Sequence, residues 1–89
     1  MFLSKLGRIT LLYDFYGSLL TPKQQEVVRL YYEYDLSLGE IGAELNISRQ
    51  AVYDVLKRAE RSLEEYETKL GLLAEYLKEH GSLISGEGG

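Results

Sequence analysis

Residues 37–61 read SLGEIGAELNISRQAVYDVLKRAER, and this stretch decides the fold of the 89-residue chain. Ser37 and Glu40 stand three residues apart, which is the spacing of a capping box at the start of a helix. We expect that short helix to end in a tight turn at Asn46, because asparagine tolerates the left-handed backbone conformation. Ser48 then caps a second helix. The stretch therefore predicts a helix-turn-helix.

The second helix of this motif carries the candidate nucleic-acid-binding residues. In a helix-turn-helix, the first turn of that helix enters a groove of the duplex. Arginine and glutamine bridge base edges with two hydrogen bonds, so we expect Arg49 and Gln50 to face bases. Lys57 and Arg61 are expected to hold phosphates, and Asp54 to tune specificity. The full candidate set is Ser48, Arg49, Gln50, Tyr53, Asp54, Lys57, Arg58 and Arg61.

Outward from this motif, the rest of the chain also has helical periodicity. Thr21, Pro22 and Gln24 supply an N-cap, a proline at the first helical position and a capping-box residue, which predict a helix to about Tyr34. Upstream, apolar residues at helical spacing predict another helix over about residues 3–17. The expected fold class is all-α, a helix-turn-helix with an N-terminal helix and a long C-terminal helix, in one domain over residues 1–80.

That long C-terminal helix is expected to start after Ser48 and to reach about residue 80. Its leucines recur every seven residues, as in a coiled-coil seam. Gly71 costs about 1 kcal/mol relative to alanine, so a kink or break near it is left open. The seam can pack on the first helix or pair two copies, and we favour a homodimer. The expected dimer interface is Leu63, Tyr66, Leu70, Leu73 and Leu77. Residues 81–89, with four glycines, are expected to be a disordered tail.

Composition argues against several classes of function. The chain has no cysteine and one histidine, which argues against a thiolate metal site, a thiol nucleophile and a histidine cluster. We interpret Glu64, Glu65 and Glu67 as the solvent-facing side of the seam helix. A non-enzymatic protein without metal or cofactor is therefore expected. Since no stretch is long and apolar enough to span a bilayer and the N-terminus does not resemble a signal peptide, we expect a cytoplasmic protein without membrane insertion.

Charge is distributed unevenly along the chain. The net charge of −4 and the pI of about 4.9 argue against general binding to polyanions. Residues 46–61 carry four basic side chains against two acidic ones, a net charge of +2. Residues 62–89 carry two lysines against six glutamates, a net charge of −4. Any nucleic-acid contact is therefore expected before residue 62, and the acidic segment needs another role.

Several strings resemble the YlxM family of small bacterial helix-turn-helix proteins. They are LYDFY at 12–16, LTPKQ at 20–24, YYEYD at 31–35, SLGEI at 37–41 and SRQAVYD at 48–54, and the likeness covers about residues 5–80. More loosely, residues 20–63 are similar to region 4 of bacterial sigma factors, where such a segment reads the −35 promoter element.

The resemblance implies stacked helices with a unit like sigma region 4. It also implies a component or regulator of the signal recognition particle pathway, because family members are typically encoded beside its protein components. The partners would then be the particle's RNA or proteins. The residues themselves also fit a stand-alone transcriptional regulator that binds duplex DNA. Both hypotheses are carried forward.

Overall fold

The computed structural model describes residues 4–85, and over this range the chain forms five α-helices and no strand. The helices are α1 (Lys5–Tyr16), α2 (Pro22–Val28), α3 (Leu38–Leu45), α4 (Arg49–Leu70) and α5 (Leu72–Ser85). A 3-10 turn (Gly17–Leu19) follows α1, and a π-helical segment (Arg29–Glu33) extends α2. The all-α class is confirmed, and α3 and α4 are the two helices of the predicted helix-turn-helix.

Three of the helices start where the local sequence signals predict. Thr21 and Gln24 form a complete capping box at α2, and Ser37 and Glu40 form another at α3. The Ser48 hydroxyl accepts a hydrogen bond from an amide in the first turn of α4. Each cap satisfies an amide that has no partner inside its own helix and typically contributes about 1 kcal/mol.

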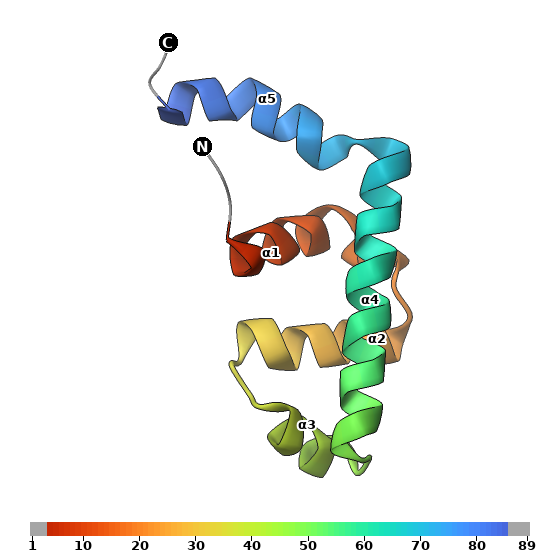
Figure 1. Cartoon of the computed structure of the whole chain (residues 1–89). Coiled ribbons are helices and arrows are strands. Elements are labelled where there is room, and N and C mark those ends of the chain that lie inside the picture. The colour runs from red at the N-terminus through yellow and green to blue at the C-terminus, as the bar shows by residue number, and fades with distance from the viewer. Residues whose placement is uncertain (1–3, 86–89) are drawn as a thin grey trace.

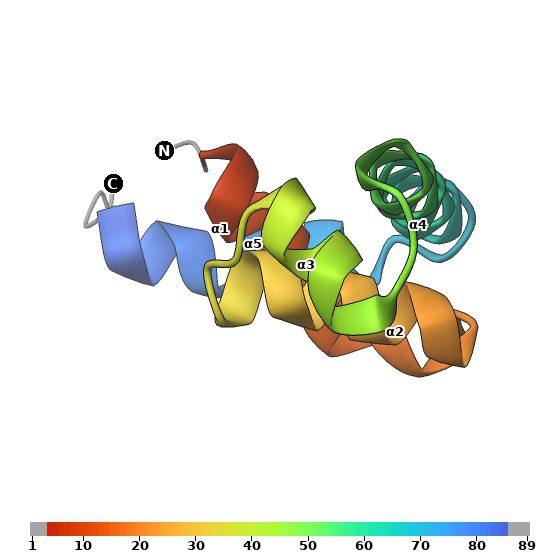
Figure 2. The same cartoon turned by 90° about the horizontal axis from the view of Figure 1, so that it is seen from below.

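Helix α4 is the helix against which α1, α2 and α3 pack (Figure 1). Helices α1, α2 and α3 lie one above another along one side of it, and α5 turns away from its far end and runs over α1. Viewed end on, α4 stands beside the other helices (Figure 2). Since α4 contacts α1, α2 and α3, one helix connects the helix-turn-helix to the rest of the fold.

The core lies between α4 and the helices stacked against it. Its fully buried members come from every helix: Leu12 and Tyr16 of α1, Val27 of α2, Ile41 of α3, Val52 and Leu63 of α4, and Leu73 of α5. Burial of one such aliphatic side chain contributes roughly 1.5–3 kcal/mol. The apolar side chains of all five helices therefore pack into one shared core.

The long helix expected from residue 49 to about residue 80 is broken at Gly71, where the sequence left a kink or break open. This residue has a φ of +66°, a left-handed conformation that ends α4, and α5 starts at the next residue in a new direction. Glycine adopts this conformation without a clash from Cβ. The expected start of a disordered tail at residue 81 is also corrected, because α5 continues to Ser85. One glycine at position 81 is too weak a breaker to end that helix, and residues 86–89 lie outside the described range.

Most residues of the leucine seam pack in the core of a single chain. Leu63 and Leu73 are fully buried, and Tyr66 and Leu77 pack against the same core. Leu70 is 56% exposed. The prediction that Leu63 and Leu73 form a dimer interface is therefore wrong. The break between α4 and α5 turns the second half of the seam back over α1, so both halves face one core.

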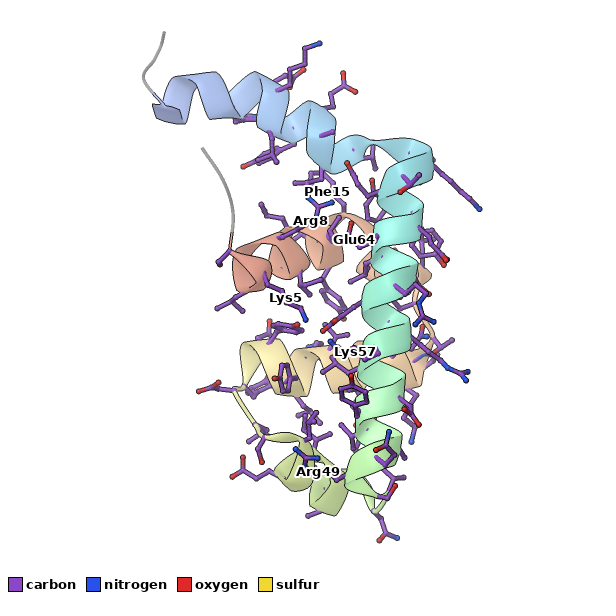
Figure 3. The ribbon with its side chains drawn as sticks, viewed as in Figure 1. Lys5, Arg8, Phe15, Arg49, Lys57 and Glu64 are labelled. Carbon is purple, nitrogen blue, oxygen red and sulfur yellow. The ribbon has the colours of Figure 1, made fainter. Side chains whose placement is uncertain are left out.

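Glu64, interpreted from the sequence as solvent-facing, fastens α1 to α4. Arg8 donates two hydrogen bonds of 2.7 Å to its two carboxylate oxygens, a bidentate pair that Figure 3 shows between the two helices. The Arg8 guanidinium holds the pKa of Glu64 below its ordinary value. Paired hydrogen bonds of this kind are stronger than neutral ones and fix the relative orientation of the two groups.

Glu67, also interpreted as solvent-facing, caps the start of α5. It accepts hydrogen bonds from the Tyr16 hydroxyl at 2.6 Å and from the amides of Leu73 and Ala74 at 3.0 and 2.8 Å. The Tyr16 hydroxyl accepts in turn from the Leu72 amide at 3.0 Å. The earlier interpretation is therefore wrong here too. A side chain of α4 and one of α1 together satisfy the first amides of α5 and set its direction.

Removing the charge of Glu67 is expected to change how stability depends on pH. Burial raises the pKa of Glu67, but the hydrogen bonds from Tyr16 and two amides outweigh it and bring the pKa below its ordinary value of 4.5. The carboxylate therefore stabilises the fold above the unfolded pKa, and this contribution disappears as pH falls through the folded pKa. We expect Glu67→Gln to lower the free energy of unfolding at pH 7 by about 1–3 kcal/mol.

The measurement is thermal unfolding followed by circular dichroism at pH 7 and at acidic pH. Below the folded pKa the difference between wild type and Glu67→Gln should shrink, because both side chains are then neutral. Glu65→Gln, an exposed position on the same helix, is the matched control and should follow the wild type at both pH values. A Glu67→Gln deficit of equal size at both pH values would contradict the assigned role of the carboxylate.

Candidate nucleic-acid interface

The turn between α3 and α4 holds the two helices in close contact. Asn46 has a φ of 60°, the left-handed conformation expected for this turn, and the Ile47 amide donates to the Gly42 carbonyl at 2.9 Å. A Cβ on Gly42 would lie 2.7 Å from the Ile47 carbonyl oxygen. Gly42 is therefore the position where the backbone of the turn approaches α3, and this contact sets α4 against α3.

The predicted contact residues lie on the exposed surface of α4 but not on one side of it, because Arg49 and Arg58 are nine positions apart and so point in opposite directions from the helix axis. Arg49, Gln50, Tyr53, Asp54, Arg58 and Arg61 are exposed, and Lys57 is half-buried. Tyr53, Asp54, Lys57, Arg58 and Arg61 line one shallow hollow of the surface. Ser48, the remaining candidate, is exposed but uses its hydroxyl to cap the helix. The structure thus brings five of the candidates together around this hollow, while Ser48, Arg49 and Gln50 lie at the start of α4.

Neighbouring side chains on the exposed surface of α4 contact one another. The Gln50 amide donates to the Asp54 carboxylate at 3.0 Å. The Lys57 ammonium lies 5.6 Å from the centre of the Tyr53 ring, a favourable cation–π distance. Within residues 4–85, Arg49, Arg58 and Arg61 form no ion pair. The exposed surface of α4 therefore presents three arginines able to bind anions. The carboxylate of Asp54 on the same surface already has Gln50 as its partner.

A buried carboxylate borders the exposed surface of α4, and the sequence analysis did not single it out. Glu60 is 8% exposed. It accepts a hydrogen bond from the Tyr32 hydroxyl at 2.6 Å and lies 3.3 Å from the Lys5 Nζ and 3.5 Å from the Lys57 Nζ. Burial and this carboxylate raise the pKa of Tyr32, so the hydroxyl stays protonated and donates. One signal was available, because Glu60 follows Leu56 by four residues and so falls on the buried side.

The part of the chain that the structure describes has neither a membrane-spanning helix nor a cluster of metal-binding side chains. No helix there is long and apolar enough to cross a membrane. Within the same residues, no three side chains of the metal-binding types gather into one group.

Comparison with known proteins places this geometry in context. Residues 3–85 match the model of the UPF0122 family, whose description reads "Putative helix-turn-helix protein, YlxM / p13 like". A UPF0122 protein of Desulforamulus reducens is 52% identical over 82 residues, which cover 92% of this chain and 70% of the relative. One from Caldanaerobacter subterraneus subsp. tengcongensis is 65% identical over 68 residues, covering 76% of this chain and 58% of the relative. One from Exiguobacterium sibiricum is 57% identical over 76 residues, covering 85% and 72% respectively. The chain thus spans 58 to 72% of the length of these three relatives.

Proposed function

The chain belongs to the YlxM/p13-like helix-turn-helix family, and from this premise we propose that it binds nucleic acid, without catalysis, through the exposed side of α4. The observation that carries the proposal is the gathering of Lys57, Arg58 and Arg61 around one hollow on the second helix of the motif, with Arg49 exposed in the first turn of the same helix. Backbone phosphates supply most of the binding energy in such complexes, and basic side chains are the groups that bind them.

Duplex DNA is the ligand that this arrangement fits best. A single helix fits the width of the major groove, and the first turn of α4 lies at the end of the molecule, where α5 and α1 do not cover it (Figure 1). Arg49 and Gln50 would meet base edges there, once Gln50 exchanges its bond to Asp54 for one to a base. Asp54 would accept from a cytosine amino group and so favour particular sequences.

A role in the signal recognition particle pathway is the second candidate, and the acidic half of the chain favours it. Residues 62–89 carry a net charge of −4. The end of α4 and all of α5 belong to this segment and lie at the other end of the fold from the first turn of α4. A surface of this sign suits a basic protein better than a nucleic acid. In this candidate function α4 would dock on the particle's structured RNA and α5 on one of its proteins.

We also propose a homodimer, with an interface at the junction of α4 and α5 in place of one that includes Leu63 and Leu73. Leu70, Leu72 and Tyr76 are the exposed apolar side chains around the junction of α4 and α5, at 56%, 44% and 37% exposure. Pairing of two copies at this junction would bury these three side chains. The dimer would then present two copies of α4, the helix proposed to bind DNA. Binding to two half-sites of a duplex then requires those helices to lie ~34 Å apart.

Replacing Arg49 and Lys57 separately is expected to weaken DNA binding in two different ways. Arg49→Ala should cost about 1–3 kcal/mol of binding free energy and relax the sequence preference at one position. Lys57→Ala should weaken binding evenly across sequences and reduce the slope of log K against log salt by about 1. The measurement is fluorescence anisotropy with a mixed-sequence duplex and with signal-recognition-particle RNA, each at several salt concentrations.

Lys69→Ala, an exposed lysine in the last turn of the same helix, is the control and should bind like the wild type. Duplex binding that neither Arg49→Ala nor Lys57→Ala changes would contradict the assignment of α4. Tighter binding to the RNA that persists at high salt would favour the second candidate over the first.

A further inference from the structure

Glu60 pairs with two lysines, Lys57 of α4, which is already part of the proposed interface, and Lys5 of α1, which lies outside the helix-turn-helix and has had no role so far. Lys5 is the first residue of α1, and Lys57 is on the third turn of α4, yet both ammonium groups lie within 3.5 Å of the same Glu60 oxygen. Figure 3 shows their side chains reaching toward each other from the two helices. The fold therefore brings together two cations that are 52 positions apart in the sequence.

Glu60 pairs with both lysines but neutralises only one of their two positive charges. The three charges sum to +1, and the Glu60 side chain is 10% exposed, whereas those of Lys5 and Lys57 are 60% and 40% exposed. The carboxylate thus lies beneath the lysines and the ammonium groups lie toward solvent. Each ammonium has three N–H donors. Lys57 donates one of them to Glu60, and Lys5 forms an ion pair with the same oxygen, so both lysines keep donors for an outside acceptor.

The position of Glu60 is itself fixed. The Tyr32 hydroxyl donates to its second oxygen at 2.6 Å, from the π-helical segment that follows α2. Three separate elements, α1, α4 and this segment, therefore meet at one carboxylate. Two lysines whose common partner is held in this way lose less side-chain freedom on binding an anion than two free lysines would.

From this arrangement, we propose that Lys5 and Lys57 together form a phosphate-binding site that extends the nucleic-acid interface from α4 onto α1, with Glu60 as its positioning residue. The ligand is a backbone phosphate of the same DNA duplex that α4 reads, so the inference rests on the proposed function. Lys57 connects the two parts, because it also lines the hollow with Tyr53 and Arg61. Lys5 is the residue that this inference adds to the interface.

The test is the salt dependence of duplex binding by Lys5→Gln. We expect the slope of log K against log salt to fall by about 1 and affinity to fall evenly across sequences, as for loss of one phosphate contact. Lys5→Arg keeps the cation and should restore the slope. Lys78→Gln is the matched control, because it removes the same charge from an exposed position on α5, and it should keep the wild-type slope. Thermal unfolding of all three variants separates binding from stability, since the Lys5–Glu60 pair is exposed on the lysine side.

The possible failures can be told apart. A Lys5→Gln slope equal to those of the wild type and Lys78→Gln, in a protein whose binding still depends on Arg49, would overturn this inference alone. Equal losses in Lys5→Gln and Lys78→Gln would overturn it as well, because they would report net charge and not a site. A wild type that does not bind duplex DNA would overturn both this inference and the function on which it rests.

Discussion

Gly42→Val is expected to destabilise the helix-turn-helix by about 3 kcal/mol, a large share of the ~5–15 kcal/mol that stabilises a typical domain. A Cβ at this position meets the Ile47 carbonyl oxygen at 2.7 Å, and the next atoms along the turn lie at 3.5 Å. The obstacle is backbone, which cannot rotate away as a side chain can. Valine also adds two methyl groups beside it. The turn must therefore move away from α3, and α4 moves with it.

Gly39→Val is the matched control for this prediction. Gly39 lies in the same helix, and its nearest neighbour for a new Cβ is the Ser37 hydroxyl at 4.0 Å. The same substitution there should leave the free energy of unfolding within about 0.5 kcal/mol of wild type, as for most surface changes. The measurement is urea unfolding followed by circular dichroism. Similar stability for the two variants would show that the turn tolerates a side chain at position 42.

Leu63→Ala is expected to cost about 2–5 kcal/mol, because it leaves a cavity in the hydrophobic core. Leu63 is fully buried, whereas Leu70, one heptad later in the same seam, is 56% exposed. Leu70→Ala should therefore change the free energy of unfolding by no more than about 0.5 kcal/mol. The two variants make the same substitution in the same seam and differ only in burial.

Urea unfolding at two protein concentrations, with light scattering for mass, is the measurement. If the homodimer forms around the junction of α4 and α5, Leu70→Ala should weaken it and leave the fold of the monomer intact. An equal loss of stability in both variants that grows on dilution would instead indicate that two copies pair along the whole seam. That result would contradict the burial of Leu63 within one chain.

Local signals allowed the starts of α2, α3 and α4 to be predicted, because a cap and its helix lie within four residues. The turn at Asn46 was predictable for the same reason. The break at Gly71 was not decided by its neighbours, since glycine is tolerated inside a helix at a cost of about 1 kcal/mol. What decides it is the packing of α5 on α1, together with the cap from Glu67 and Tyr16.

The same distinction holds at the candidate interface. The exposed side of α4 could be predicted because helical periodicity separates Tyr53 and Asp54 from the buried Val52. The cluster at Glu60 could not, because it depends on where α1 and the π-helical segment lie relative to α4. A charged residue on a buried side marks a position that needs partners, but its partners lie elsewhere in the chain.

The bonds that hold α1 in place also determine when it can fold during synthesis. Arg8 and Tyr16 find their partners in Glu64 and Glu67, which are 56 and 51 positions later. At the ~5–20 residues per second of translation, roughly 3–10 s pass between the synthesis of α1 and that of its anchors. During that interval Leu12 and Tyr16, fully buried in the finished protein, have no cover from α4 or α5. Helix α1 is thus completed by α4 and α5, and the nascent chain carries an uncovered apolar helix until these two helices have been made.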